Sequence, residues 1–161
     1  MEDLFREIRA AIKADAWVLA LFGTLAVPDI CAALESSNGQ TNGKKYRRWV
    51  RENLGDAYPE LDPDELYRMR CSLLHQGQSS MASFKRVIFM RRTDGNIWHR
   101  NKVGDAFNLD LPIFCNDVMT AAEGWLEANK LRPDVVRNSV SLVRWHRGGL
   151  LPYVDGIDVL S

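Results

Sequence analysis

An apolar stripe runs along residues 111–130 and is the clearest helix signal in the chain. Its period of 3.6 residues predicts a long amphipathic helix with one apolar face. Pro133 follows the expected end of this helix. The stripe consists of Leu111, Phe114, Cys115, Val118, Ala122, Trp125 and Leu126.

The first third of the chain predicts further helices. Residues 2–14 place Leu4, Phe5, Ile8, Ala11 and Ile12 on one helical face. The apolar run Ala16–Pro28 is expected to form a more buried helix up to a break at Val27-Pro28. Residues 29–35 are expected to form another short helical piece, and the polar, glycine-containing residues 36–43 a loop.

Two more helices are expected before the middle of the chain. Residues 44–54 read as a helix that Gly55 stops. Asp62-Pro63-Asp64-Glu65 is the best helix start, because Asp62 can cap, Pro63 fits the first position and Glu65 suits a capping box. This helix is expected to end near His75-Gln76-Gly77.

The hydrophobic pattern changes in the middle of the chain. Residues 84–91 and 97–103 are rich in β-formers and flank Asp94-Gly95, a strong hairpin signal. Residues 140–145 are expected to form a strand or an irregular segment. The prediction is a mainly α fold: one domain over residues 1–161, with a β-hairpin insertion at about 84–103.

Composition and charge exclude several classes of protein. Hydrophobic residues make up 46% of the 161 residues and charged residues 26%, which excludes disordered chains, collagens and disulfide scaffolds. A net charge of +0 argues against a histone-like basic coat but not against a local basic patch. Cys31, Cys71 and Cys115 form no CxxC, which suits a reducing compartment and gives no metal site.

No targeting or membrane segment is expected. The chain starts Met1-Glu2-Asp3-Leu4, acidic where a signal peptide is basic. The run Ala16–Pro28 is shorter than the about 20 apolar residues that a membrane span needs. We therefore expect a cytoplasmic protein without a cofactor.

The segment Leu66–Gly77 carries the most informative motif. Arg70 and His75 are separated by four residues near the end of a capped helix, just before a glycine. This resembles the R-x(4–6)-H signature of the HEPN superfamily, helical domains that include many metal-independent endoribonucleases. The segments DICAALE at 29–35, KKYRRW at 44–49 and RCSLLHQG at 70–77 extend the resemblance to about half of the chain. Most HEPN ribonucleases carry Asn, Asp or another polar residue after the arginine, where this chain has Cys71.

The resemblance implies a HEPN-like helical bundle and a function on RNA, as a toxin or defence effector. RNA supplies its own nucleophile, the 2′-hydroxyl, so cleavage needs proton transfer and stabilisation of the charged phosphorane. His75 can transfer the proton, and an arginine can bind two phosphate oxygens. The implied partners are RNA, a second copy of the chain and an antitoxin protein.

Two arginines compete for the phosphate-binding role. Five residues advance about 500° around a helix, so Arg70 and His75 lie about 140° apart. Seven residues advance about 700°, which brings Arg68 and His75 almost onto one face. Arg70 matches the local pattern better and Arg68 matches the face better, so both stay candidates.

A basic segment forms the second candidate site. Its basic residues can neutralise phosphates, and its aromatic residues Tyr46 and Trp49 can stack on bases, although core packing is the more common role at this spacing. Acidic residues at 56, 60, 62, 64 and 65 follow at once and can complement the basic block within the protein. The candidate RNA-binding residues are Lys44, Lys45, Arg47, Arg48 and Arg51.

The other two histidines are weaker candidates. His99 is expected at the surface of a strand, and His146 lies in another basic and aromatic group.

Two alternatives to the catalytic function remain open. The first is a non-catalytic HEPN-like module that binds RNA, a nucleotide or a protein. The second is a structural domain that uses its apolar helix or hairpin for assembly.

Overall fold

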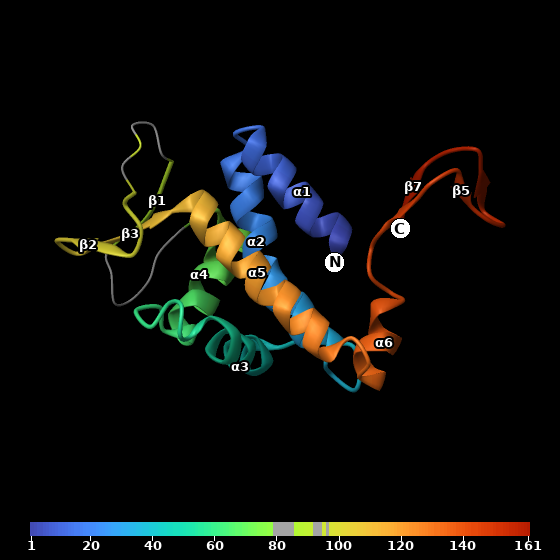
Figure 1. Cartoon of the computed structure of the whole chain (residues 1–161), viewed down its shortest axis with the longest axis horizontal. Coiled ribbons are helices and arrows are strands. Elements are labelled where there is room, and N and C mark those ends of the chain that lie inside the picture. The colour runs from blue at the N-terminus through green and yellow to red at the C-terminus, as the bar shows by residue number, and fades with distance from the viewer. Residues whose placement is uncertain (79–85, 92–94, 96) are drawn as a thin grey trace.

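The computed structural model describes residues 1–78, 86–91, 95 and 97–161. Helices dominate this part of the chain, and the prediction of a mainly α fold is confirmed (Figure 1). The helices are α1 (Glu2–Lys13), α2 (Trp17–Leu34), α3 (Gly43–Leu54), α4 (Pro63–Gln76), α5 (Leu111–Asn129) and α6 (Pro133–Ser139).

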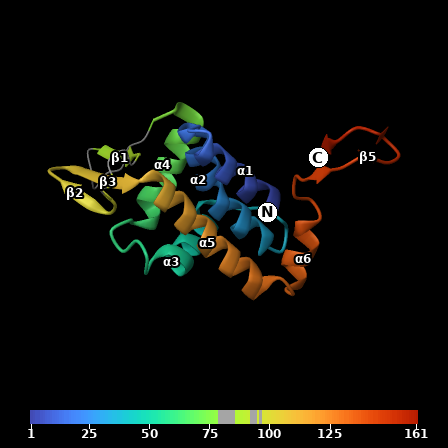
Figure 2. The same cartoon turned by 45° about the horizontal axis from the view of Figure 1, so that its top comes forward.

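Helix α2 lies at the centre of the helical part. It contacts α1, α3, α4, α5 and α6. Helix α5 lies alongside it in both views (Figures 1 and 2). Buried residues lie on all sides of α2, as expected for a helix enclosed by others. The core fills the space between these helices with large side chains, among them Leu25, Trp49, Phe114 and Met119.

The predicted break at Val27-Pro28 is wrong, because α2 continues through Pro28 to Leu34. A proline inside a helix removes one hydrogen bond and costs about 3 kcal/mol. Val27 and Cys31, on either side of it, are completely buried. Burial of a large apolar side chain stabilises by about 1.5–3 kcal/mol, so the packing around Pro28 outweighs the local cost.

The length of the continuous α2 bears on whether it could span a membrane. Helix α2 has 18 residues and is long and apolar enough to cross a membrane by length and composition. Length excludes a membrane span for the shorter run Ala16–Pro28, but it does not exclude one for α2. Instead, 56% of this helix is buried against the rest of the chain, which is the environment of a core helix.

The expected helix ends near the candidate site are confirmed. A side-chain oxygen of Asp62 accepts a hydrogen bond from the Asp64 amide at 3.0 Å, and Pro63 takes the first helical position of α4. Gly77 ends α4 with φ +69°, a conformation that favours glycine. Asn42 caps α3 by accepting a bond from the Lys45 amide at 3.0 Å.

The predicted β-hairpin of residues 84–91 and 97–103 is wrong in its pairing. Strands β1 (Arg86–Met90) and β2 (Asn101–Val103) are not neighbours, because both pair with β3 (Ala106–Asp110). Strand β1 is parallel to β3, and β2 is antiparallel to it. The Asp94 position and residues 84–85 lie outside the described residues.

The hairpin instead forms one strand later in the sequence. Gly104 has φ +60° and lets the chain reverse between β2 and β3. Strand β3 then takes the central position because Phe107 and Leu109 are completely buried. It leads directly into α5, whose first turn is capped by Asp110.

Helix α6 was not expected from the sequence, and one side chain attaches it to the end of α2. The Asn138 amide nitrogen donates toward the carbonyl oxygens of Ala33, Leu34 and Ser36, at 3.3, 2.9 and 2.8 Å. These carbonyls lie at or just after the end of α2, where the i+4 helical partner is missing, and those of Ala33 and Ser36 also accept the backbone amides of Ser36 and Gly39 at 3.0 and 3.3 Å. The short polar residue therefore closes one helix and positions the next.

Residues 144–161, called the arm from here on, form an irregular hairpin that extends away from the helices (Figures 1 and 2). Strands β4 (Trp145–His146) and β7 (Val159–Leu160) pair at its base. Strands β5 (Gly149–Leu150) and β6 (Val154–Asp155) pair farther out. The expected strand at 140–145 is thus reduced to its last residue.

Candidate functional site

Helix α4 carries all three residues of the predicted catalytic group, in two different surroundings. Arg68 and His75 are exposed, whereas Arg70 is partly buried. Arg68 and His75 lie two turns apart, which places them on nearly the same face of the helix. His75 also lies in the last turn, where the helix dipole favours a positive charge.

Arg70 points toward α2 and forms an ion pair there. Its Nε lies 2.6 Å from Oδ2 of Asp29, and the two side chains are only 21% and 11% exposed. Burial raises the pKa of the Asp29 carboxyl, while the charge of Arg70 opposes this shift. Thr41 donates a further, long hydrogen bond of 3.5 Å to Oδ1 of Asp29. The guanidinium of Arg70 is therefore engaged within the chain.

The surroundings of Arg70 contain two more polar groups. Its Nη1 lies 3.7 Å from the sulfur of Cys71. Burial lowers the pKa of Arg70, but the interactions with Cys71 and Asp29 outweigh this effect and raise it. The hydroxyl of Tyr46 is buried nearby, with no hydrogen-bond partner among the described residues, and burial raises its pKa strongly. Arg70 thus belongs to a polar group enclosed between α2, α3 and α4.

Arg68 and His75 have no such neighbours. Neither side chain has a hydrogen bond or ion pair within the part of the chain that the structure describes. Both are open to solvent on the outer side of α4. The geometry therefore separates the two candidate arginines: Arg70 is paired with Asp29, whereas Arg68 has no partner among the described residues and is exposed on the same face as His75.

The basic residues of α3 are divided in the same way. Arg47 pairs with Asp64 and lies over the ring of Tyr67 at 4.5 Å. Lys45 donates to the carbonyl of Gln40 at 2.7 Å. Lys44 and Arg51 are exposed and lack a partner among residues 1–78, 86–91, 95 and 97–161. The predicted complementation of the basic block by later acidic residues is confirmed for Arg47 and Asp64.

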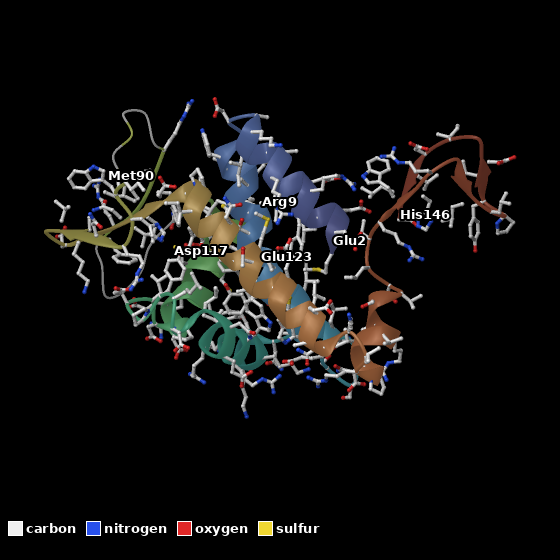
Figure 3. The ribbon with its side chains drawn as sticks, viewed as in Figure 1. Glu2, Arg9, Met90, Asp117, Glu123 and His146 are labelled. Atoms are coloured by element: carbon white, nitrogen blue, oxygen red, sulfur yellow. The ribbon has the colours of Figure 1, made fainter. Side chains whose placement is uncertain are left out.

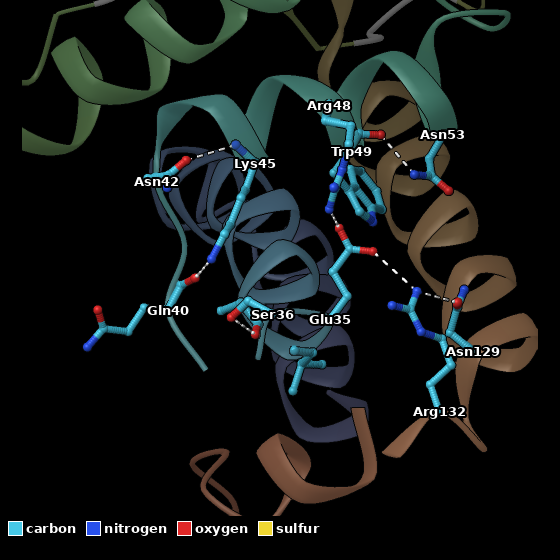
Figure 4. Close-up of polar contacts among 12 residues, drawn as sticks. Glu35, Ser36, Gln40, Asn42, Lys45, Arg48, Trp49, Asn53, Asn129 and Arg132 are labelled. Carbon is cyan, nitrogen blue, oxygen red and sulfur yellow. Dashed lines mark hydrogen bonds and ion pairs between the residues drawn. The ribbon is translucent and has the colours of Figure 1, made fainter. Parts of the chain in front are cut away.

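Arg48 takes part in a structural contact around Glu35 (Figure 4). It pairs with the Glu35 carboxylate, whose other oxygen lies 3.6 Å from Arg132. The Glu35 side chain is only 9% exposed. Arg132 also donates to Asn129 at 3.1 Å. This contact connects the end of α2 with α3 and the end of α5, so Arg48 stabilises the fold. Tyr46 and Trp49 are completely buried, as the core interpretation expects.

The expectation of a surface histidine at position 99 is wrong. The His99 side chain is 13% exposed, and its Nε2 lies 3.0 Å from the Tyr58 hydroxyl. That hydroxyl donates to Oδ2 of Asp117 at 2.6 Å. Nδ1 of His99 accepts the amide of Asp110 at 3.3 Å. In a neutral ring Nε2 therefore carries the proton and donates a hydrogen bond to the hydroxyl oxygen of Tyr58.

The group Tyr58–His99–Asp117 connects three separate segments of the chain. Burial lowers the pKa of His99, against the charges of Asp117 and Asp110. Burial also raises the pKa of Tyr58 strongly. Both shifts favour neutral rings, so the group serves as a packed hydrogen-bonded joint. The sequence does not predict this group, because Tyr58 and Asp117 lie far apart along the chain and neither has a local pattern that points to the other.

Comparison with protein-family models, with curated proteins and with solved structures finds no match to this chain. No group of three or more potential metal-binding side chains lies together in the described part of the chain. The interpretation of the site therefore depends on the arrangement of its own residues.

Proposed function

We propose that this chain is a metal-independent endoribonuclease of HEPN type, which acts on RNA through the outer side of α4. His75 is the general acid/base, and Arg68 stabilises the charge on the phosphate. The 2′-hydroxyl attacks the neighbouring phosphorus as His75 removes its proton. The bond to the 5′-oxygen breaks, which leaves a 2′,3′-cyclic phosphate and a 5′-hydroxyl end.

One observation carries this proposal. Arg68 and His75 are exposed, lie two turns apart on one helix face and have no partner in the described part of the chain. An arginine on the same helix face as a histidine offers a fixed positive charge and an imidazole that can exchange a proton. Lys44 and Arg51 on α3, which have no partner among the described residues, add positive charge for the RNA backbone.

The role of a second copy also belongs to the proposal. A single histidine cannot remove one proton and deliver another in the same step. In a homodimer the second copy supplies the other histidine, or its Arg68 reaches the first site. Such a toxin or defence effector would act in the cytoplasm and be controlled by an antitoxin protein.

The experiment uses a labelled single-stranded RNA in buffer that contains a metal chelator. We expect cleavage by the wild-type chain, at least a hundredfold loss in His75→Ala and a smaller loss in Arg68→Ala. His146→Ala is the matched control, because His146 lies on the arm, well away from α4 (Figure 3). An RNA with 2′-deoxyribose at the cleaved position should stay intact.

The outcomes separate this function from the alternative. Cleavage that persists in His75→Ala would contradict the catalytic assignment. A non-catalytic RNA-binding module is favoured by one observation: Arg70, the arginine of the family's local pattern, is held by Asp29. Salt-dependent RNA binding without cleavage, weakened by Arg68→Ala, would establish that second function.

A further inference from the structure

The arm presents many apolar side chains and buries none of its residues. All eighteen positions of residues 144–161 are exposed or only partly buried. Leu151, Tyr153 and Ile157 are 74%, 80% and 66% exposed, and Leu160 is half exposed. A two-stranded hairpin without a packed face is marginally stable in water. The apolar side chains of the arm are therefore exposed to solvent, although burial against another surface would stabilise the hairpin.

Among the described residues, the hydrogen bonds between the arm and the helices lie at its base. The Trp145 backbone amide donates to Asp3, and its indole nitrogen donates to Glu7, both at 3.0 Å. Arg144 and Ser161 exchange backbone hydrogen bonds of 2.8 and 3.1 Å and close the hairpin there. These contacts fix the direction of the arm, and the ribbon of its outer half extends away from the other described elements (Figure 2).

An open groove lies beside the base of the arm. It has a volume of about 790 Å³ and runs between the start of α1, the last turns of α5 and α6. Its apolar lining includes Phe5, Leu126, Val135, Val136 and Leu142, of which Val136 is 54% exposed. We call it the arm groove. Residues 142–144 belong to its wall and lead directly into the arm.

We propose that two copies of this chain exchange arms, with the outer half of each arm seated in the arm groove of the other copy. In an isologous contact the same surface of both copies takes part, so an arm-in-groove contact made once is made twice. The arm and the groove form one continuous surface on each copy, because residues 142–144 join them. The exchange covers the apolar residues of both arms and both grooves at once.

The charges of both surfaces are compatible with an approach of two identical copies. Arg147 pairs with Asp158 within the arm. Arg9 and Glu123 pair across the groove at 2.6 Å and point toward one another (Figure 3). Lys130 pairs with Glu127 on the groove rim. Since these charges are neutralised within one copy, the contact between copies depends on apolar surface and avoids like-charge repulsion.

The size of the paired surfaces also suits a second copy. A stable interface takes about 20–30 residues from each partner, and the outer half of the arm together with the 15 residues that line the groove supplies a set of this size. In both views the arm and α4 lie toward different ends of the molecule (Figures 1 and 2). The exchange therefore leaves the outer side of α4 open. The second copy that the proposed function places beside His75 would meet this chain at a different surface, on α4.

The first test measures the mass of the full chain in solution by light scattering and sedimentation. We expect a dimer for the wild type and at least a tenfold higher dissociation constant for the arm variant Tyr153→Asp/Ile157→Asp. The groove variant Val136→Glu should weaken the dimer in the same way. Leu19→Asp is the matched control. Leu19 is 67% exposed, much like Ile157 at 66%, but it lies on α2 outside the groove.

The second test mixes the arm variant with the groove variant. The arm variant keeps an intact groove and the groove variant keeps an intact arm, so one arm-in-groove contact can still form. We expect a heterodimer in the mixture that neither variant forms alone.

Three results would overturn the proposal. They are a wild-type chain that stays monomeric, a dimer that resists both variants, and a mixture that forms no heterodimer. The last result would indicate that arms contact arms. His75→Ala should dimerise like the wild type, so this test and the test of RNA cleavage can fail separately.

Discussion

Two histidines of this chain lie in opposite surroundings. His99 is enclosed, with hydrogen-bonding neighbours on both ring nitrogens from Tyr58 and Asp110. His75 is exposed and has no partner in the described part of the chain. The enclosed ring joins three segments, whereas the open ring is exposed to solvent. The comparison separates polar residues that hold this fold together from those that are available to a ligand.

The arginines repeat the same contrast on one helix. Arg70 reaches Asp29 on α2, and Arg68 extends into solvent two residues earlier. A shift of two positions along α4 moves a side chain by about 200° around the helix, from the packed side to the open side. Substitutions at the enclosed positions should therefore lower stability, and substitutions at the open positions should leave it unchanged.

The largest decrease in stability is expected from Asp29→Ala. This change leaves the charge of Arg70 without its partner in a mostly buried position. Removal of one member of a buried ion pair costs about 3 kcal/mol in the free energy of unfolding. Urea denaturation followed by circular dichroism measures the decrease.

A second variant tests the cause. Asp29→Leu combined with Arg70→Met replaces both charges with apolar groups and should recover most of the stability that Asp29→Ala removes. Arg68→Met is the matched control, since it removes an arginine of the same helix without breaking an ion pair. Equal decreases in Asp29→Ala and the double variant would show that the ion pair is not the reason.

A smaller decrease is expected from Tyr58→Phe. The hydroxyl donates to Asp117 at 2.6 Å and lies 3.0 Å from His99, while the ring itself stays in the core. Phenylalanine keeps the ring and removes only the hydrogen bonds, so we expect the free energy of unfolding to fall by about 1–2 kcal/mol. Tyr153→Phe, at an exposed tyrosine, should change nothing. An unchanged unfolding midpoint in Tyr58→Phe would exclude the joint as a source of stability.

The same joint predicts how stability depends on pH. Burial lowers the pKa of His99 in the folded chain below its ordinary value of about 6.5. Between the two pKa values the unfolded chain binds more protons than the folded chain, so stability falls as the pH decreases. The contribution is complete above about pH 6.5 and is lost as the pH falls through the folded pKa. Thermal unfolding at several pH values measures this slope.

Two comparisons assign the slope to His99. His99→Gln removes the titrating ring and should flatten the slope just below pH 6.5, and His75→Gln should leave it as in the wild type. A hydrogen bond with Arg100 lowers the pKa of Glu60, and its contribution is lost only at more acidic pH. A slope that survives in His99→Gln would assign it to other groups.

The helices could be predicted from the sequence because their signals are local. Asp62-Pro63 and Gly77 mark the two ends of α4, and the apolar stripe of residues 111–130 marks α5. The continuation of α2 through Pro28 could not be predicted in this way. It depends on the burial of Val27 and Cys31 by residues from other helices, which outweighs the local preference of proline.

The strand pairing and the polar partners of the site depend on residues far apart in the sequence. The central position of β3 follows from the burial of Phe107 against the helices, not from the turn signal at Asp94-Gly95. The spacing of Arg68, Arg70 and His75 on α4 was visible in the sequence. The partner that distinguishes the two arginines, Asp29, lies on another helix and has no local signature.

The smallest effect on stability is expected from the open basic residues of α3. Lys44→Ala/Arg51→Ala removes two exposed charges without a partner in the described part of the chain, so the free energy of unfolding should change by less than about 0.5 kcal/mol. Arg48→Ala is the enclosed counterpart, because it takes a charge away from the nearly buried Glu35 and should cost about 1 kcal/mol.

RNA binding should reverse this order. If Lys44 and Arg51 bind phosphates, the double variant lowers the affinity for single-stranded RNA. It should also reduce the slope of log affinity against log salt by about 0.7 for each phosphate that is no longer neutralised. Arg48→Ala should keep the wild-type slope, since its charge is already paired. A double variant with an unchanged slope would remove α3 from the RNA surface and leave the outer side of α4 as the remaining candidate.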